Sequence, residues 1–362
     1  MTRTPRARRA ITALAAAGTL VVGLAACGSG STDAGSAGGS DKAKVTLILK
    51  DLQNPFFTAL ADGAKAEAAK DGVELTVVAA KKDGDEQGQI DEIESAVLKG
   101  QNGILILPSG PAVNKAMNDA RAQGVTVIAL DTPPDPIDTA DITFATDNFE
   151  AGKLIGEWSK AFMASKPATI AMLDQFSDRT IQTDLNRDQG FLEGMGIDLA
   201  DKTKKGDEAK TGTYGDGGTY TIACQEPTTG AEDGGRTAME NCLTKNKNIN
   251  LVYTINEPSA AGAYKALQAA GLQDKVTIVS IDGSCAGVEN VSKGVIAATS
   301  QQYPVKMAEL GVKAIADKVA GKALPAVTDG LNFYNTGTAL ITDKAEDGVK
   351  SITTADGSKI CW

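Results

Sequence analysis

The chain has 362 residues, which allows two or three domains at about 100 to 200 residues each. It contains no histidine, which excludes Ser-His-Asp and Cys-His nucleophiles, His-ligated zinc and imidazole acid–base chemistry. Hydrophobic residues make up 42% of the chain and aromatic residues 4%, a composition typical of a globular protein rather than a disordered or multi-span membrane chain. Because the formal net charge is −10, no nucleic-acid partner is expected.

The first 26 residues have the pattern of an export signal. Four arginines precede an uncharged stretch, 10–26, which is short for a bilayer span and has the size of a signal-peptide apolar region. Its end, Leu24-Ala25-Ala26-Cys27, resembles the lipobox of bacterial lipoproteins, which implies cleavage before Cys27 and acylation of that cysteine. An ordinary secretory signal is the alternative. Residues 27–41, rich in Gly, Ser and Ala, are predicted to be a flexible linker, with the folded part beginning near Lys42.

Beyond the linker, short apolar runs alternate with longer stretches of helical spacing. Strands are predicted at 45–49, 74–79, 103–107 and 125–130, with helices at 57–70, 89–99 and 113–123 between them. The pattern resumes with helices from 149, 185, 235 and 260, strands at 169–173, 219–224, 251–255, 276–281 and 295–299, and a helix at 305–318. Residues 201–216 are polar and Gly-rich and are predicted to be a surface insertion. The alternation predicts two doubly wound α/β lobes with parallel sheets.

Polar side chains follow several predicted strands, at the edge of the sheet where α/β proteins bind ligands. Asp131, Asn256 and Asp282 each come directly after an apolar run, and an Asn-Pro-Phe-Phe sequence at 54–57 follows the first strand. Carboxylates and amides suit vicinal hydroxyls, and aromatic rings suit the C–H faces of a sugar. Each residue also has a purely structural interpretation: a turn former for Asp131 and Asp282, a helix cap for Asn256, core packing for Phe56 and Phe57, and a solvated or salt-bridged side chain for Arg187.

Taken together, these motifs resemble those of the type I sugar-binding proteins of bacterial ABC importers. The resemblance covers nearly all of the chain after the linker and is strongest to the fructose-binding group. It differs from the ribose binders at two places, which argues against ribose as the main ligand: Thr132 stands where they have an arginine, and Thr228-Thr229-Gly230 stands where they have an aromatic residue. The motifs that carry the resemblance are 54–57, 129–133, 144–148, 187–191, 255–258, 281–283 and 301–304.

The resemblance implies a two-lobed clamp with three crossovers and a sugar in the cleft. The N-terminal lobe would comprise 42–146 plus about 303–333, and the C-terminal lobe 147–302 plus about 334–362. Phe56 and Phe57 would stack on the sugar. Thr146 and Asp147 would lie at the first crossover and contribute more weakly. The hydrogen-bonding residues would be Asn54, Asp131, Arg187, Asn256, Asp282 and Gln302.

We therefore expect an exported monomer, anchored by lipid to the outer face of the cell membrane, that binds a monosaccharide and delivers it to an ABC permease with its ATPase. D-Fructose is the expected sugar, and ribose, mannose or xylose are the alternatives. No enzymatic activity, cofactor or metal is expected. Two other roles remain open: a sugar sensor for a chemoreceptor or kinase, and a carbohydrate-active enzyme that uses Asp131 and Asp282.

Four cysteines remain beyond Cys27, and three pairings are possible by arithmetic. We expect Cys224 to pair with Cys242, because one ends a strand and the other lies on the helix that packs back onto it. Cys285 follows another strand, and the last segment of the chain can return Cys361 to it. Free buried thiols are the alternative.

Overall fold

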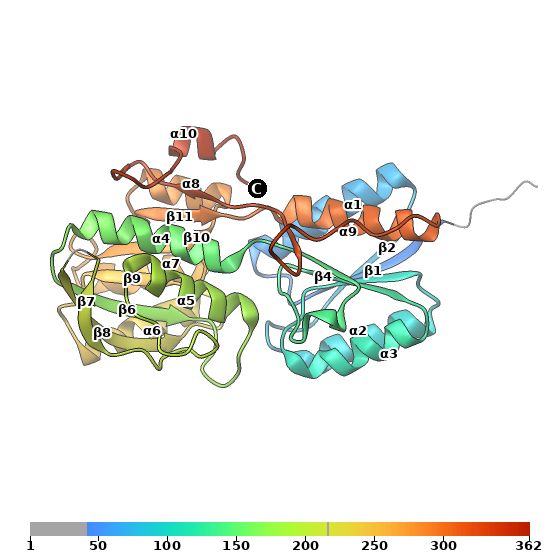
Figure 1. The fold of residues 1–362 in the computed structure, drawn as a ribbon, viewed down its shortest axis with the longest axis horizontal. Coiled ribbons are helices and arrows are strands. Elements are labelled where there is room, and N and C mark those ends of the chain that lie inside the picture. Colours follow the sequence, from blue (N-terminus) through green and yellow to red (C-terminus); the bar gives the residue numbers. More distant parts are fainter. Residues whose placement is uncertain (1–41, 216) are drawn as a thin grey trace, which may run out of the picture. The chain divides into compact units, whose positions relative to one another are not determined.

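Two sheets, each covered by helices on both faces, form the part of the chain that the computed structural model describes, residues 42–215 and 217–362 (Figure 1). This arrangement confirms the predicted α/β fold class. No helix in the described part is long and apolar enough to cross a bilayer. The predicted signal peptide, Cys27 and the linker lie outside the described residues.

The first sheet is entirely parallel, in the order β12-β5-β4-β3-β1-β2. Its buried runs of Val, Leu and Ile are typical of strands covered on both faces. Helices α1 (Pro55–Asp71) and α9 (Pro304–Val319) pack on one face, and α2 (Glu86–Leu98) and α3 (Asn114–Ala122) on the other. The strands are β1 (Lys44–Leu49), β2 (Glu74–Ala79), β3 (Gly103–Ile106), β4 (Thr126–Leu130), β5 (Ile142–Ala145) and β12 (Tyr334–Asn335).

The second sheet has the order β13-β11-β10-β9-β6-β8-β7, with antiparallel strands at both edges. Helices α4 (Asn148–Met163) and α5 (Gln182–Met195) pack on one face, and α6 (Glu232–Lys245), α7 (Glu257–Ala269) and α8 (Cys285–Ser292) belong to the other, while α10 (Thr354–Gly357) lies near α8. The strands are β6 (Ala168–Asp174), β7 (Thr211–Tyr214), β8 (Gly218–Pro227), β9 (Leu251–Thr254), β10 (Thr277–Asp282), β11 (Ala298–Gln301) and β13 (Ala339–Ile341).

The chain crosses between the sheets three times, after β5, after β11 and after β12. We call 42–145 with 304–335 the N-terminal lobe, and 148–301 with 339–362 the C-terminal lobe. Tyr334 and Asn335 pair with Phe144 and Ala145 in the first sheet, so the third crossover follows Asn335.

Two segments differ from prediction. The strand predicted at 295–299 begins at Ala298, because the amides of Val295 and Ile296 donate to the Asn290 carbonyl near the end of α8 and not to a neighbouring strand. The predicted insertion is more than a surface loop, since it supplies β7 and directs Lys205 onto Asp184. A sequence pattern of polar residues and glycines does not distinguish a loop from a short, half-exposed edge strand.

Both expected disulfides form. Cys224 on β8 bonds Cys242 on α6 with a Cα–Cα distance of 5.5 Å, and Cys285 bonds Cys361 with a Cα–Cα distance of 4.8 Å. The first bond ties a helix to its own sheet. The second brings the segment after α10 back to the start of α8.

Candidate ligand-binding cleft

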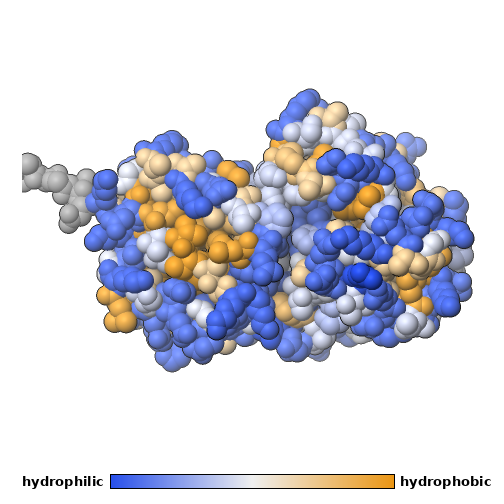
Figure 2. Space-filling model, turned by 180° about the vertical axis from the view of Figure 1, so that it is seen from behind, coloured by the Kyte–Doolittle hydropathy of each residue, from blue (hydrophilic) through white to orange (hydrophobic). Residues whose placement is uncertain are grey.

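A cavity lies between the lobes where strands of both sheets end. It continues into a larger groove that shares Asn54, Asp83 and Asp282 with it, and a groove between the lobes is visible in Figure 2. The cavity is lined by Lys50, Asn54, Phe56, Phe57, Asp83 and Asp131 of the N-terminal lobe, by Thr183, Gln175, Arg187, Ile255, Asn256 and Asp282 of the C-terminal lobe, and by Gln302 of the second crossover.

This lining contains every predicted binding residue except Thr146 and Asp147. Thr146 is fully buried on the first crossover. Asp147 caps α4, where its Oδ1 accepts a hydrogen bond from the Glu150 amide at 3.1 Å. Neither residue is among those that line the cavity. The chain crosses between the lobes at these two residues, and the carboxylate of Asp147, which directly precedes α4, caps the N-terminus of that helix.

Two phenylalanines form an apolar wall. Asn54 Oδ1 accepts from the Phe56 amide at 2.9 Å and so caps α1, with Pro55 at the first helical position. Two adjacent helical residues point in different directions, so ordinary core packing predicts that one of the rings is exposed. Both rings are instead 4% exposed, and they meet edge to face with centroids 5.9 Å apart.

Asp131 and Asp282 provide one buried carboxylate from each lobe. Both have backbone conformations that non-glycine residues rarely adopt, with φ of 62° for Asp131 and 156° for Asp282. Asp131 is held by its own amide, which donates to the Phe144 carbonyl at 2.9 Å, and its Oδ2 accepts from the Thr132 hydroxyl at 2.8 Å. Such backbone strain concentrates at functional sites, which strengthens the binding interpretation over the turn-former interpretation.

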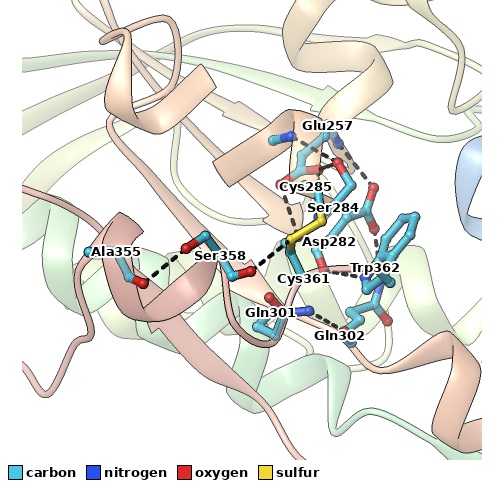
Figure 3. The surroundings of a disulfide bond; sticks show 12 residues. Glu257, Asp282, Ser284, Cys285, Gln301, Gln302, Ala355, Ser358, Cys361 and Trp362 are labelled. Carbon is cyan, nitrogen blue, oxygen red and sulfur yellow. Dashed lines mark hydrogen bonds between the residues drawn. A yellow bond between two sulfur atoms is a disulfide. The ribbon is translucent and has the colours of Figure 1, made fainter. Parts of the chain in front are cut away.

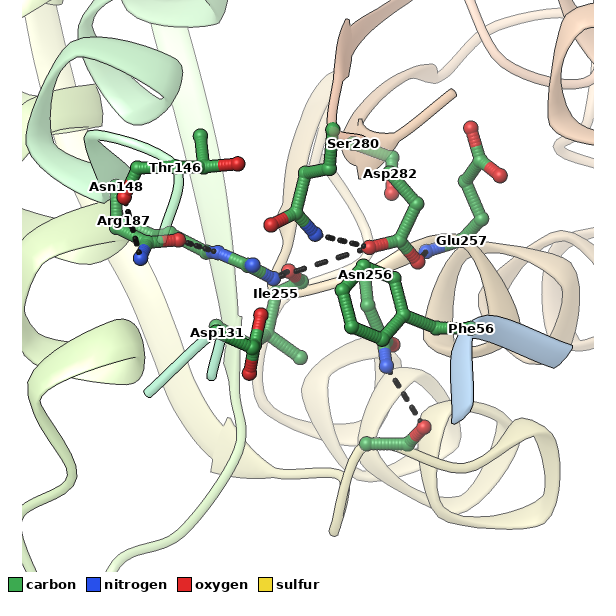
Figure 4. Close-up of polar contacts among 12 residues, drawn as sticks. Phe56, Asp131, Thr146, Asn148, Arg187, Ile255, Asn256, Glu257, Ser280 and Asp282 are labelled. Atoms are coloured by element: carbon green, nitrogen blue, oxygen red, sulfur yellow. Dashed lines mark hydrogen bonds and ion pairs between the residues drawn. The ribbon is translucent and has the colours of Figure 1, made fainter. Parts of the chain in front are cut away.

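Asp282 is the centre of a polar cluster shown in Figure 4. Its Oδ1 accepts from Gln302 Nε2 at 2.8 Å and its Oδ2 from the Glu257 amide at 3.2 Å. Arg187 Nη1 lies 4.0 Å from the same Oδ1. Burial and, to a smaller extent, the neighbouring Glu257 carboxylate raise the pKa of Asp282 to about 8, although Arg187 opposes the shift. A protonated Asp282 can donate a hydrogen bond as well as accept one.

Arg187 is fixed within the C-terminal lobe. Its Nε donates to Asn148 Oδ1 at 2.8 Å, and its Nη1 donates to the Ile255 carbonyl at 2.9 Å. The position of Arg187 depends on close packing of α4 against α5. The two helices approach so closely that a Cβ at Gly152 would lie 2.2 Å from the Arg187 carbonyl oxygen. Of the two structural alternatives for Arg187, burial rules out a solvated side chain, whereas a salt-bridged one agrees with the 4.0 Å distance to Asp282.

Gln302 and Asn256 differ in what they can offer a ligand. Gln302 is 1% exposed, and its Oε1 is buried without a hydrogen-bond partner among the described residues. Asn256 caps α7, accepting from the Ser259 amide at 3.1 Å, and its Nδ2 donates to the Gly230 carbonyl at 2.8 Å. The structure thus bears out the helix-cap interpretation of Asn256, whereas Gln302 retains an acceptor for a ligand hydroxyl.

Four polar residues of the cavity were not predicted from the sequence: Lys50, Asp83, Gln175 and Thr183. Lys50 Nζ lies 3.8 Å from Asp83 Oδ2, and Gln175 Nε2 of the other lobe donates to the same oxygen at 2.5 Å. Burial raises the pKa of Asp83, while Lys50 acts to lower it. Lys50 directly follows β1, and Gln175 directly follows β6, so the rule that located Asp131 and Asp282 could have found both.

Each cation that lines the cavity lies beside a carboxyl group. Lys50 Nζ is 3.8 Å from Asp83 Oδ2, and Arg187 Nη1 is 4.0 Å from Asp282 Oδ1, so neither cation stands apart from an acidic side chain. Carboxylates, amides and two aromatic rings together suit a neutral molecule that has several hydroxyl groups and an apolar face. Within 42–215 and 217–362, no group of three or more cysteine, aspartate or glutamate side chains is placed to hold a metal ion.

Residues 45–323 match the family model of the periplasmic binding protein domain. The chain belongs to this family. It is 29% identical over 285 residues to the ribose import binding protein RbsB of Salmonella typhimurium, covering 78% of this chain and 87% of the relative. The D-allose-binding periplasmic protein of Escherichia coli is 26% identical over 286 residues, with coverage of 78% and 87%.

Among solved structures, the fold is similar to that of the Caulobacter myo-inositol binding protein bound to myo-inositol. The TM-score is 0.70 at 24% identity, over 83% of this chain and 93% of that one. These findings confirm the predicted family at the level of the periplasmic binding protein domain. Because the matched relatives are import and binding proteins, the chain is a binding protein rather than an enzyme.

Proposed function

We propose that this protein captures a neutral monosaccharide in the interlobe cleft and delivers it to the permease of an ABC importer. The observation that carries the proposal is the chemistry of the cavity: two buried aromatic rings, carboxyl groups from both lobes and an acceptor on Gln302 that has no partner among the described residues surround one space. A sugar has hydroxyl groups for the polar atoms and a C–H face for the rings.

Capture follows from closure of the lobes around the sugar, a motion known for periplasmic binding proteins as a class. Contacts between the lobes already surround the cavity: Gln175 with Asp83, Arg179 Nη1 with the Gly84 carbonyl at 3.1 Å, and Gln182 with Asp135 at 3.3 Å. A sugar that contacts both lobes binds the closed form more tightly than the open one. It therefore shifts the equilibrium by that difference in affinity, and the permease recognises the closed form.

D-Fructose is the sugar that we propose. The relatives described above are named for ribose, allose and myo-inositol, but this chain has Thr132 where the ribose binders have an arginine. The buried Thr132 hydroxyl bonds Asp131 and leaves the carboxylate without a neighbouring cation at that position. The 228–230 segment likewise brings no aromatic ring to the cleft. Ribose, mannose and xylose are the competing sugars.

A thermal-shift panel over monosaccharides tests the function. A ligand at about 1,000 times its dissociation constant adds about 4 kcal/mol to the stability of the native state. We expect D-fructose to raise the melting temperature at the lowest concentration, with ribose, mannose and xylose requiring more. If another monosaccharide raises the melting temperature more than D-fructose does, that sugar is the ligand. If no sugar raises it at millimolar concentration, the proposed function is wrong.

We further propose that the protein is exported, cleaved before Cys27 and held at the membrane by acylation of that residue, with 27–41 as the tether. The motivation is the sequence 24–27 and the Gly- and Ser-rich stretch that follows. Wild type should partition into detergent, whereas Cys27→Ala should be released into the medium. Light scattering of the unlipidated protein checks the proposed monomer.

A further inference from the structure

The side chain of Trp362 contacts both lobes at the rim of the cleft. Its Nε1 donates to the carbonyl oxygen of Asp282 at 3.3 Å, in the C-terminal lobe (Figure 3). Its ring meets that of Phe56, in the N-terminal lobe, edge to face at a centroid distance of 5.4 Å and an angle of 86°. One indole thus contacts two residues that line the cavity.

Trp362 is held by a covalent link to the C-terminal lobe only. Cys361 is covalently bonded to Cys285, the first residue of α8, and the Cys285 amide donates to the Trp362 carbonyl at 3.0 Å. These two bonds anchor the segment to the turn that carries Asp282. By contrast, the contact with Phe56 has no covalent support.

We propose that Trp362 is a latch for the closed cleft: the Cys285–Cys361 disulfide holds it on the C-terminal lobe, and its ring engages Phe56 only when the lobes are together. The proposal rests on the proposed function for its ligand. Lobe separation moves Phe56 away from a ring that cannot follow, because the disulfide keeps Trp362 beside Asp282. The aromatic contact is therefore present in the closed form and lost in the open form.

The latch has two effects on a bound sugar. It stabilises the closed form, because an edge-to-face aromatic pair contributes beyond the area that it buries. It also covers part of the exit, since Trp362 lines the groove together with Asn54, Ser284 and Asp282. Both effects act after the sugar has entered, so the latch should slow dissociation far more than it changes association.

The first experiment measures D-fructose binding by calorimetry and stopped flow. Trp362→Ala and the pair Cys285→Ser/Cys361→Ser should weaken affinity by about threefold to tenfold, mainly through faster dissociation. Trp362→Phe keeps a ring but loses the Nε1 donor, so its effect should be intermediate. The matched control is Cys224→Ser/Cys242→Ser, which removes the other disulfide, between β8 and α6, and should bind like wild type once folding is verified. If D-fructose dissociates from Trp362→Ala at the wild-type rate, the latch proposal is overturned.

The second experiment needs no sugar, because a short bis-maleimide crosslink in Asp135→Cys/Gln182→Cys holds the lobes together at a side-chain pair that meets across them at 3.3 Å. The sequence contains two tryptophans, and the other, Trp158, is fully buried within the C-terminal lobe. In a Trp158→Phe background, acrylamide quenching therefore reports on Trp362 alone. In the crosslinked form, quenching should increase when Phe56→Ala or Cys285→Ser/Cys361→Ser is added.

The two experiments distinguish an error in the proposed sugar from an error in the latch proposal. If wild type binds no D-fructose, the proposed sugar is wrong, and the quenching data alone decide the latch. Unchanged quenching of Trp362 in the crosslinked Phe56→Ala protein then overturns it.

Discussion

The guanidinium of Arg187 lies 4.0 Å from the carboxylate of Asp282, and both side chains are about 6% exposed. The other bonds of Arg187, to Asn148 and Ile255, all lie within the C-terminal lobe. This half of the cleft is therefore organised before the lobes close. Such preorganisation reduces the ordering cost that a ligand would otherwise have to offset.

Asp131→Ala and Asp282→Ala should each weaken D-fructose binding by one or two orders of magnitude. Leaving a buried sugar hydroxyl without its hydrogen-bond partner costs about 1–3 kcal/mol, whether the carboxyl group that is removed was charged or protonated, which corresponds to that range. Paired melting and titration curves provide the measurement. Asp62→Ala, at an exposed carboxylate on α1, is the control and should bind like wild type. Unchanged dissociation constants in both cleft variants would mean that the cleft is misplaced.

Arg187→Lys should lower both affinity and stability although it keeps the charge. A lysine cannot reproduce the geometry by which Arg187 donates to Asn148 Oδ1 and the Ile255 carbonyl, so a buried acceptor loses its donor at a cost of about 1–3 kcal/mol. Urea unfolding and D-fructose titration of the same preparation measure the two effects. Wild-type behaviour in both would show that only the charge at 187 matters.

Asp282→Asn should reduce the pH dependence of stability between about pH 4 and pH 8. In this range the unfolded carboxyl has lost its proton, whereas burial raises the pKa of Asp282 to about 8 in the folded state. Rising pH therefore favours unfolding by up to about 1.4 kcal/mol per pH unit, and the penalty becomes constant above the folded pKa. Asparagine does not titrate and removes this contribution.

Urea unfolding at several pH values tests this expectation. The curves of wild type and Asp282→Asn should diverge as pH rises from 4 to 8, with the variant gaining relative stability. Asp62→Asn, at an exposed site, serves as the control for losing one carboxylate. Parallel curves for wild type and Asp282→Asn would contradict the raised pKa of Asp282.

Gly152→Ala should destabilise the fold by about 1–3 kcal/mol and weaken sugar binding as well. Its new methyl group would overlap the Arg187 carbonyl, so α4 and α5 must move apart and carry Arg187 with them. Gly100→Ala is the comparison. Gly100 has a φ of 66° but open space around it, so alanine there adds about 1–2 kcal/mol of backbone strain and leaves affinity unchanged. If Gly152→Ala and Gly100→Ala bind the sugar with equal affinity, the position of Arg187 does not depend on the contact between α4 and α5.

The sequence predicted the alternating α/β pattern and most of the cleft, because strand ends are readable from apolar runs and the cleft lies where strands end. Asp131, Asp282 and Arg187 follow from that rule together with the family motifs. Asp83 does not, because it lies four residues beyond the end of β2 and reaches the cavity only through the turn that follows. Loop conformation decides such a placement, and periodicity carries no information about it.

The direction in which a side chain points also could not be predicted from the sequence. Asp147 and Asn256 both begin helices next to the cleft, and the structure shows that each caps its helix. Trp362 shows the converse. The expected Cys285–Cys361 disulfide placed its backbone near α8, but nothing in the local sequence indicates that the ring reaches Phe56 across the cleft.

The interleaving of the two lobes has a consequence for how the chain becomes structured during its synthesis. Strands β1 to β5 are made first, but the helix α9 that packs against α1, and the edge strand β12, come only after most of the second sheet. A nascent chain of about 300 residues would thus leave one face of its first sheet partly uncovered. Neither half can reach its final packing alone, so the N-terminal half should stay loosely packed and open to chaperones or a translocation channel until residues near 335 have emerged.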